Sequence, residues 1–177
     1  MEELKELKER METQRPEPWE TLPDLALYMD QLISYMPRQL IRFSEGDALT
    51  SAMVNNYIKD GLLPRAEGKR YGREHLARLT AICALKSVIS MREMGVLFGA
   101  MDQEGQAQAR YETLLGELDR ALDKVAGPLD ADASEEDLAA LALSLALDSY
   151  ASKLACQRVL GIIEEKRPQT GESKKKK

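Results

Sequence analysis

Apolar residues recur every three or four positions along most of this chain, the spacing that gathers them on one face of an α-helix. The first such segment places Leu4, Leu7 and Met11 among glutamates and lysines. Pro16 and Pro18 then interrupt the pattern and predict a linker. Over the whole chain the pattern predicts a mainly α-helical fold, with helices over residues 2–13, 24–43, 51–60, 73–88, 91–101, 106–126 and 134–166.

Residues suited to helix ends stand at several of these boundaries. Thr50 or Ser51 can cap the third helix, and Ser90 and Ser134 precede two later ones. Gly61 follows the third helix, where a left-handed backbone favours glycine. The boundaries of the later helices are therefore the best specified.

A small β-hairpin is predicted between the third and fourth helices. Residues 62–64 (Leu-Leu-Pro) and 70–71 (Arg-Tyr) are its expected arms, around a turn at residues 66–68 (Ala-Glu-Gly). Another turn is expected at residues 44–47. The order helix, hairpin wing, supporting helix predicts a winged helix-turn-helix.

The remainder of the chain is expected to be helical. The run from Leu138 to Leu147 is apolar almost all round, so it must be covered, either in a helical bundle or at a dimer interface. We expect a homodimer held through residues of about 104–165; the alternative is a monomer whose C-terminal helices pack on the helix of residues 24–43.

Four segments follow from these patterns. They are an N-terminal helix and linker (1–18), a winged helix-turn-helix domain (19–101), a helical C-terminal region (102–166) and a disordered basic tail (167–177).

Charge is distributed unevenly along the chain. The net charge is −5, yet residues 59–78 hold six cations against three anions, a local net charge of +3. Residues 102–165 hold 5 cations and 14 anions, a net charge of −9. A polyanion responds to the local field, so the segment 59–78 is a candidate surface for a nucleic acid.

The helix of residues 51–60 carries the strongest functional signal. Its apolar face comprises Met53, Val54, Tyr57 and Ile58, and its polar face Ser51, Ala52, Asn55, Asn56 and Lys59. Asparagine can pair with the edge of adenine, while serine and lysine reach phosphates or guanine. We expect double-stranded DNA to contact Ser51, Asn55, Asn56 and Lys59, with backbone anchoring by Arg65, Lys69, Arg70 and Arg73.

Two resemblances point the same way. The order Val54, Tyr57, Gly61-Leu-Leu-Pro, Lys69 and Tyr71 resembles the N-terminal domain of MerR-type winged-helix regulators, although Asn55-Asn56 replaces their usual Arg-Tyr pair. The chain more closely resembles the bacterial family known as domain of unknown function 1836. The stretches that carry this resemblance are residues 22–31, 49–59 and 69–76. It implies transcriptional regulation and supplies neither an effector nor a target.

Several other classes of protein find no support in the sequence. Cys83, Cys156 and His75 do not form a metal-binding pattern, no cofactor motif is present, and no catalytic constellation predicts an enzyme. His75 is expected to be exposed or to cap a helix. The N-terminus lacks the apolar segment of a signal peptide, and the run 138–147 is about half of a membrane span, so we expect a cytoplasmic protein without a membrane partner.

The functional hypothesis is therefore a DNA-binding transcriptional regulator. The alternative is a protein-interaction module that keeps the same scaffold without binding DNA, a reading supported by the acidic total. Neither the operator sequence nor the inducing signal is specified by these patterns.

Overall fold

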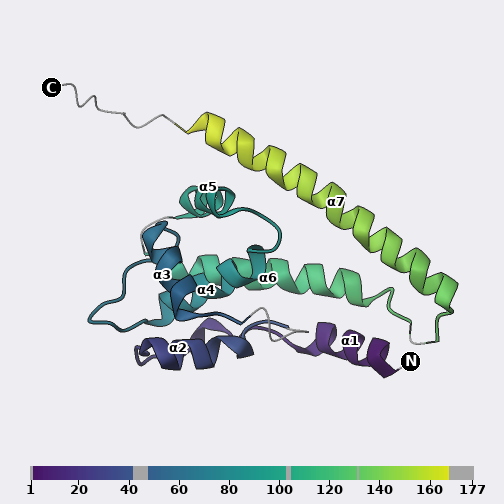
Figure 1. Ribbon diagram of the computed structural model, residues 1–177, viewed down its shortest axis with the longest axis horizontal. Helices are drawn as coiled ribbons and strands as arrows, with labels where there is room; N and C mark the ends of the chain where they lie inside the picture. Colours follow the sequence, from purple (N-terminus) through teal and green to yellow (C-terminus); the bar gives the residue numbers. More distant parts are fainter. Residues whose placement is uncertain (1, 42–47, 103–104, 131, 168–177) are drawn as a thin grey trace.

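The computed structural model describes residues 2–41, 48–102, 105–130 and 132–167, and within these ranges the regular structure is helical (Figure 1). The turn predicted at residues 44–47 and nearly all of the predicted tail, residues 168–177, lie outside the described residues. The helices, with η for 3₁₀ turns, are α1 (Glu2–Thr13), η1 (Trp19–Thr21), α2 (Met29–Tyr35), η2 (Met36–Arg38), α3 (Ser51–Lys59), α4 (Arg73–Leu85), α5 (Met91–Met101), α6 (Ala107–Ala126) and α7 (Glu135–Lys166).

The predicted serine caps are confirmed. Ser90 Oγ accepts a hydrogen bond from the backbone of Glu93, whose carboxylate accepts one from Ser90 N at 2.7 Å. Ser134 and Asp137 form the same reciprocal arrangement at the start of α7. Hydrogen bonds from the capping serines lower the pKa of both acidic side chains.

The helix predicted over residues 24–43 is much shorter in the structure. The backbone of Leu27 exchanges hydrogen bonds of 2.9 and 2.8 Å with Tyr71, so this residue cannot join a helical ladder. α2 therefore begins only at Met29, and the chain tightens into η2 where Pro37 lacks a backbone donor. The apolar spacing of residues 24–43 predicts Leu25 and Tyr28 on the buried stripe of a helix, yet Leu25 is 77% exposed.

The predicted β-hairpin wing is wrong. The described residues contain two isolated bridges, Leu27 with Tyr71 and Glu67 with Arg70, and no strand. Each proposed arm has another partner: the amides of Leu62 and Leu63 donate to the Tyr57 carbonyl, and Tyr71 pairs with Leu27. What remains is a tight turn at Gly68 and Lys69, both at positive φ, so the fold is all-α and not a winged helix.

The core surrounds α4, whose Leu76, Leu79 and Ile82 are completely buried. Leu32 of α2 and Val54 of α3 join them in one apolar cluster. α6 packs against α4 (Figure 1) and against η1, where Trp19 meets Tyr111 with ring centroids 6.1 Å apart. α4 thus shares one core with α3, the helix that carries the predicted base-contacting residues.

A small polar network is enclosed within this core. The Gln39 side chain is fully buried; its Oε1 lies 3.1 Å from Tyr111 Oη, and its Nε2 donates to Tyr35 Oη. Thr80 Oγ1 donates to the Leu76 carbonyl at 2.9 Å. Burial raises the pKa of Tyr111 to about 12, still further above neutral pH than the ordinary value of 10.0.

The N-terminal helix packs on the second half of α6 (Figure 1). Arg15, just beyond α1, forms ion pairs with Asp119 at 2.5 Å and Asp123 at 2.8 Å. Lys8 Nζ donates to the carbonyl of Leu129 at 3.1 Å. These contacts join the beginning of the described chain to residues more than a hundred positions later.

The last helix lies along the edge of the molecule (Figure 1). It packs on α5, and Cys156, Leu160 and Ile163 contact the core, so the expected alternative in which it packed on residues 24–43 is not what the structure shows. Among the described residues, α7 alone is long and apolar enough to cross a membrane by length and composition. One such helix is weak evidence for a membrane span: the core helices of soluble proteins meet the same criterion, although those are mostly buried and the apolar window of α7 is not.

Candidate nucleic-acid interface

α3 is anchored through one face. Thr50 Oγ1 accepts a hydrogen bond from the Met53 backbone at 3.3 Å and fixes the start of the helix. Val54 and Tyr57 are buried, and Met53 and Ile58 pack beside them against the core. The predicted apolar face is confirmed, and it fixes the orientation of the opposite face.

That opposite face is exposed to solvent along its whole length. It presents Ser51, Ala52, Asn55, Asn56 and Lys59. Two neighbouring amides flanked by small residues allow close approach to another surface, and each amide offers a donor and an acceptor together. The predicted division of the helix into a buried and an exposed face therefore holds for every residue.

The chain reverses directly after α3. Gly61 has a φ of 73° and donates its amide to the Ile58 carbonyl at 3.1 Å. This left-handed conformation suits glycine and directs Leu62 and Leu63 into the core. The loop that follows returns to the surface and ends in the turn of Gly68 and Lys69.

The cations of this loop are on the surface. Arg65, Lys69 and Arg70 are exposed, and the guanidinium of Arg70 stacks on the Tyr28 ring, 5.0 Å from its centroid. Arg70 Nη2 also donates to the Tyr28 hydroxyl at 2.9 Å. Tyr28, 47% exposed, thus joins the candidate surface, whereas the sequence pattern placed it on the buried stripe of a helix.

Two further cations of the basic segment are directed inward. Arg73 donates through Nε and Nη2 to the Leu22 carbonyl at 3.2 and 3.0 Å, and its guanidinium lies over the Trp19 ring. Arg78 donates to the Leu62 carbonyl at 3.0 Å and pairs with Asp102. Arg73, expected to bind the DNA backbone, is committed to the fold in this structure.

The surface charge is consequently smaller than the sequence count suggests. Of the six cations between residues 59 and 78, the exposed ones are Lys59, Arg65, Lys69 and Arg70. The three anions of the same segment, Asp60, Glu67 and Glu74, are exposed as well.

A family model described as domain of unknown function (DUF1836) matches residues 17–115, more than half of the chain. The chain belongs to the DUF1836 family. No curated protein and no solved structure matches it. The family resemblance is thus confirmed, while the similarity to MerR-type regulators stays a prediction from sequence.

The DUF1836 region runs from just before η1 into the first half of α6. It includes α3, the turn at Gly68 and Lys69, and Tyr111, whose hydroxyl contacts the buried network. α1, the second half of α6 and all of α7 lie outside it. The candidate interface is therefore a property of the DUF1836 region, and α7 is an addition to it.

His75 stabilises the start of α4 within the DUF1836 region. Its Nδ1 accepts a hydrogen bond from the Gly72 backbone at 3.1 Å, and Nε2 lies 3.3 Å from the Arg65 carbonyl. A neutral ring with its proton on Nε2 satisfies both contacts. The predicted capping role is confirmed, and through Arg65 the imidazole also holds the basic loop against α4.

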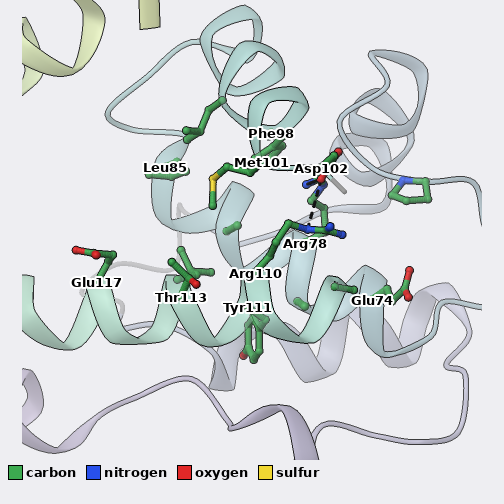
Figure 2. A pocket seen from close by; sticks show the side chains of 16 residues that line it. Glu74, Arg78, Leu85, Phe98, Met101, Asp102, Arg110, Tyr111, Thr113 and Glu117 are labelled. Atoms are coloured by element: carbon green, nitrogen blue, oxygen red, sulfur yellow. Dashed lines mark hydrogen bonds and ion pairs between the residues drawn. The ribbon is translucent and has the colours of Figure 1, made fainter. Parts of the chain in front are cut away.

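A cavity of about 330 Å³ lies between α4, α5 and α6 of the DUF1836 region (Figure 2). Figure 2 shows Leu85, Phe98 and Met101 along its wall and Arg78 directed at Asp102 on its rim. Arg78 Nη1 donates to Asp102 at 3.0 Å, and Arg110 Nε lies 3.5 Å from the same carboxylate. Apolar side chains form most of its wall, and Glu74, Asp102 and Glu117 add carboxylates, of which Asp102 is paired with Arg78 and Arg110.

No metal centre accompanies these features in the described part of the chain. There, no group of three or more histidine, cysteine, aspartate or glutamate side chains is placed to hold an ion. Cys83 and Cys156 are free thiols, each half-buried.

Proposed function

We propose that this chain is a DNA-binding transcriptional regulator in which α3 contacts base edges of double-stranded DNA. The observation that carries the proposal is the exposed polar face of α3, with Asn55 and Asn56 side by side above a firmly buried opposite face. A helix held in this way can enter a major groove without losing its packing. Ser51 and Lys59 mark the two ends of the contact.

The turn at Lys69 and Arg70 supplies the second part of the proposed interface. Its cations neutralise phosphates, and the stacking of Arg70 on Tyr28 restricts one of them before DNA arrives. The exposed cations Lys59, Arg65, Lys69 and Arg70 permit about four phosphate contacts, which corresponds to a salt slope of about −3 to −4. A protein that binds DNA in this way is located with the genome, in the cytoplasm.

Alanine at Asn55 or Asn56 is expected to weaken binding to the preferred DNA site by about 1–3 kcal/mol. The physical reason is the loss of a bidentate pairing with one base. Alanine favours helix more than asparagine does, so α3 itself is not weakened. The measurement is a titration of a site selected from a random DNA pool, with a scrambled duplex as the control. Equal losses on both duplexes would show that the amides contact the backbone instead.

The double substitution Lys69→Ala and Arg70→Ala is expected to weaken binding to every duplex and to reduce the salt slope by about 2. Thermal stability should change little, because both side chains are exposed. The matched control removes two exposed cations of α6, Arg120→Ala with Lys124→Ala. If both double variants bind DNA equally well, the turn is not part of the interface.

A protein-interaction module is the second candidate function. The observation that favours it is the near balance of exposed cations and anions around α3, together with the exposed Leu25 beside Tyr28. Retention on heparin distinguishes the two candidates: a DNA-binding surface gives retention that falls steeply with salt, and a protein-binding surface gives none.

A further inference from the structure

α7 carries an apolar stripe on the side that faces away from the core. Leu143, Leu147, Tyr150 and Leu154 are 62%, 57%, 64% and 50% exposed. They follow one another at intervals of four, three and four residues, which is the heptad spacing of helices that pair along a seam. A single exposed apolar side chain needs no explanation, but four such side chains in one line do.

The stripe is separate from the face that holds α7 in place. Cys156, Leu160 and Ile163 pack toward the core, on another side of the helix at 100° per residue. Arg92 of α5 is ion-paired with Glu164 at 2.7 Å and adds to this attachment. α7 can therefore accept a second helix on its stripe and keep all of its present contacts.

The charge of α7 indicates what that second helix is. Its first half, residues 135–150, contains four acidic residues and no cation. Its second half, residues 151–166, contains three cations and two acidic residues. Two copies aligned in parallel would oppose like charges, whereas two antiparallel copies would oppose unlike ones.

We propose that α7 pairs with α7 of a second copy of this chain in antiparallel orientation. In this register Leu143 packs against Leu154 of the second copy, and Leu147 packs against its Tyr150. In the same register Glu136 lies opposite residue 161 and Arg158 opposite residue 139, so Glu136 and Arg158 are within one helical turn of each other across the seam, at both of its ends. The pairing refines the homodimer expected from sequence and does not depend on DNA binding.

A membrane is the other occupant that the composition of α7 allows. The observations favour a second copy, because Asp148, Lys153 and Arg158 divide the helix with charges that are costly in a bilayer. Insertion would also strip Leu160 and Ile163 from the core. Pairing with a second copy places none of these charges in a bilayer and leaves Leu160 and Ile163 in the core.

The first experiment is sedimentation equilibrium of the full chain and two variants at micromolar concentration. Wild type is expected to be dimeric. Leu147→Asp should weaken association about a hundredfold or more, because it places a charge without a partner inside the seam. Ala155→Asp introduces the same charge at an exposed position away from the stripe and should leave the dimer intact. Circular dichroism confirms that both variants keep their helices.

The second experiment tests the orientation. Glu136→Arg and Arg158→Glu should each weaken the dimer about three- to tenfold, and the double variant should restore it. Only an antiparallel seam predicts this rescue, since a parallel seam brings like charges together in the double variant too.

Three results would overturn the proposal. They are a monomer of wild type across the whole concentration range, equal dimerisation of wild type and Leu147→Asp, and a monomeric wild type that floats with phospholipid vesicles. The last of these would assign α7 to a membrane. None of them bears on DNA binding by α3, because no DNA is present in these measurements.

Discussion

Gln39→Ala is expected to lower the free energy of unfolding by about 2–5 kcal/mol, the range for truncating a buried side chain of this size to alanine. Gln39 is fully buried where η2, α4 and α6 meet, so the vacated space has little route to collapse. Urea denaturation followed by circular dichroism measures the loss. The effect should appear as a lower midpoint with an unchanged slope.

Gln39→Leu separates packing from hydrogen bonding at the same position. Tyr111 Oη also lies 2.8 Å from the Glu17 carbonyl, and Thr80 Oγ1 lies 2.9 Å from the Leu76 carbonyl. Each hydroxyl has one proton and keeps an acceptor after the amide is lost. Leucine fills most of the volume, so we expect a cost of only about 1–2 kcal/mol. An equal cost for alanine and leucine would mean that the hydrogen bonds of Gln39 dominate.

Arg78→Ala is expected to cost about 2–4 kcal/mol of unfolding free energy, because three interactions end together. The guanidinium donates to the carbonyl of the buried Leu62, pairs with Asp102, and lies 4.2 Å from the centroid of the Phe98 ring. Its loss leaves the Leu62 carbonyl without this donor. The same urea titration measures the change.

Asp102→Ala is the matched control for Arg78. It removes the ion pairs of Asp102 with Arg78 and Arg110 but leaves the contacts of Arg78 with Leu62 and Phe98, and Asp102 is partly exposed. We therefore expect about 1 kcal/mol or less. Arg78→Lys should fall between the two, because an ammonium cannot reproduce the forked geometry. If the two alanine variants lose equal stability, the ion pair outweighs the contacts inside the core.

The sequence predicted the helices whose signals are local. Ser90 with Glu93 and Ser134 with Asp137 are capping pairs within four residues, and their helices begin where expected. The division of α3 also followed from local periodicity, since every turn of a helix repeats the same environment. This is why the predicted exposed face of α3 is correct in every residue.

Contacts between distant residues decided what the sequence could not. Leu27 and Tyr71 are paired across 44 positions, and this bridge shortened α2 and removed one arm of the predicted hairpin. The spacing of apolar and polar residues near Tyr71 does not predict that Leu27 is its partner. A backbone group satisfied by a remote segment is not available to the local structure that periodicity predicts.

The electrostatics of the site could be predicted only in part. Arg65, Lys69, Arg70 and Arg73 look equivalent in a list of cations, yet the structure exposes three of them and commits Arg73 to the Leu22 carbonyl. Such a choice depends on which acceptors the fold brings near each side chain. Tyr28 was missed for the same reason, because its contact with Arg70 spans 42 residues.

The packing of α1 on α6 has a consequence for how the chain folds during synthesis. Asp119, the ion-pair partner of Arg15, is synthesised 104 residues after it, a delay of about 5–20 s at typical translation rates. A helix of twelve residues is marginally stable alone, so α1 stays unstructured while the ribosome makes the residues of the core. α1 therefore emerges long before the part of α6 on which it docks.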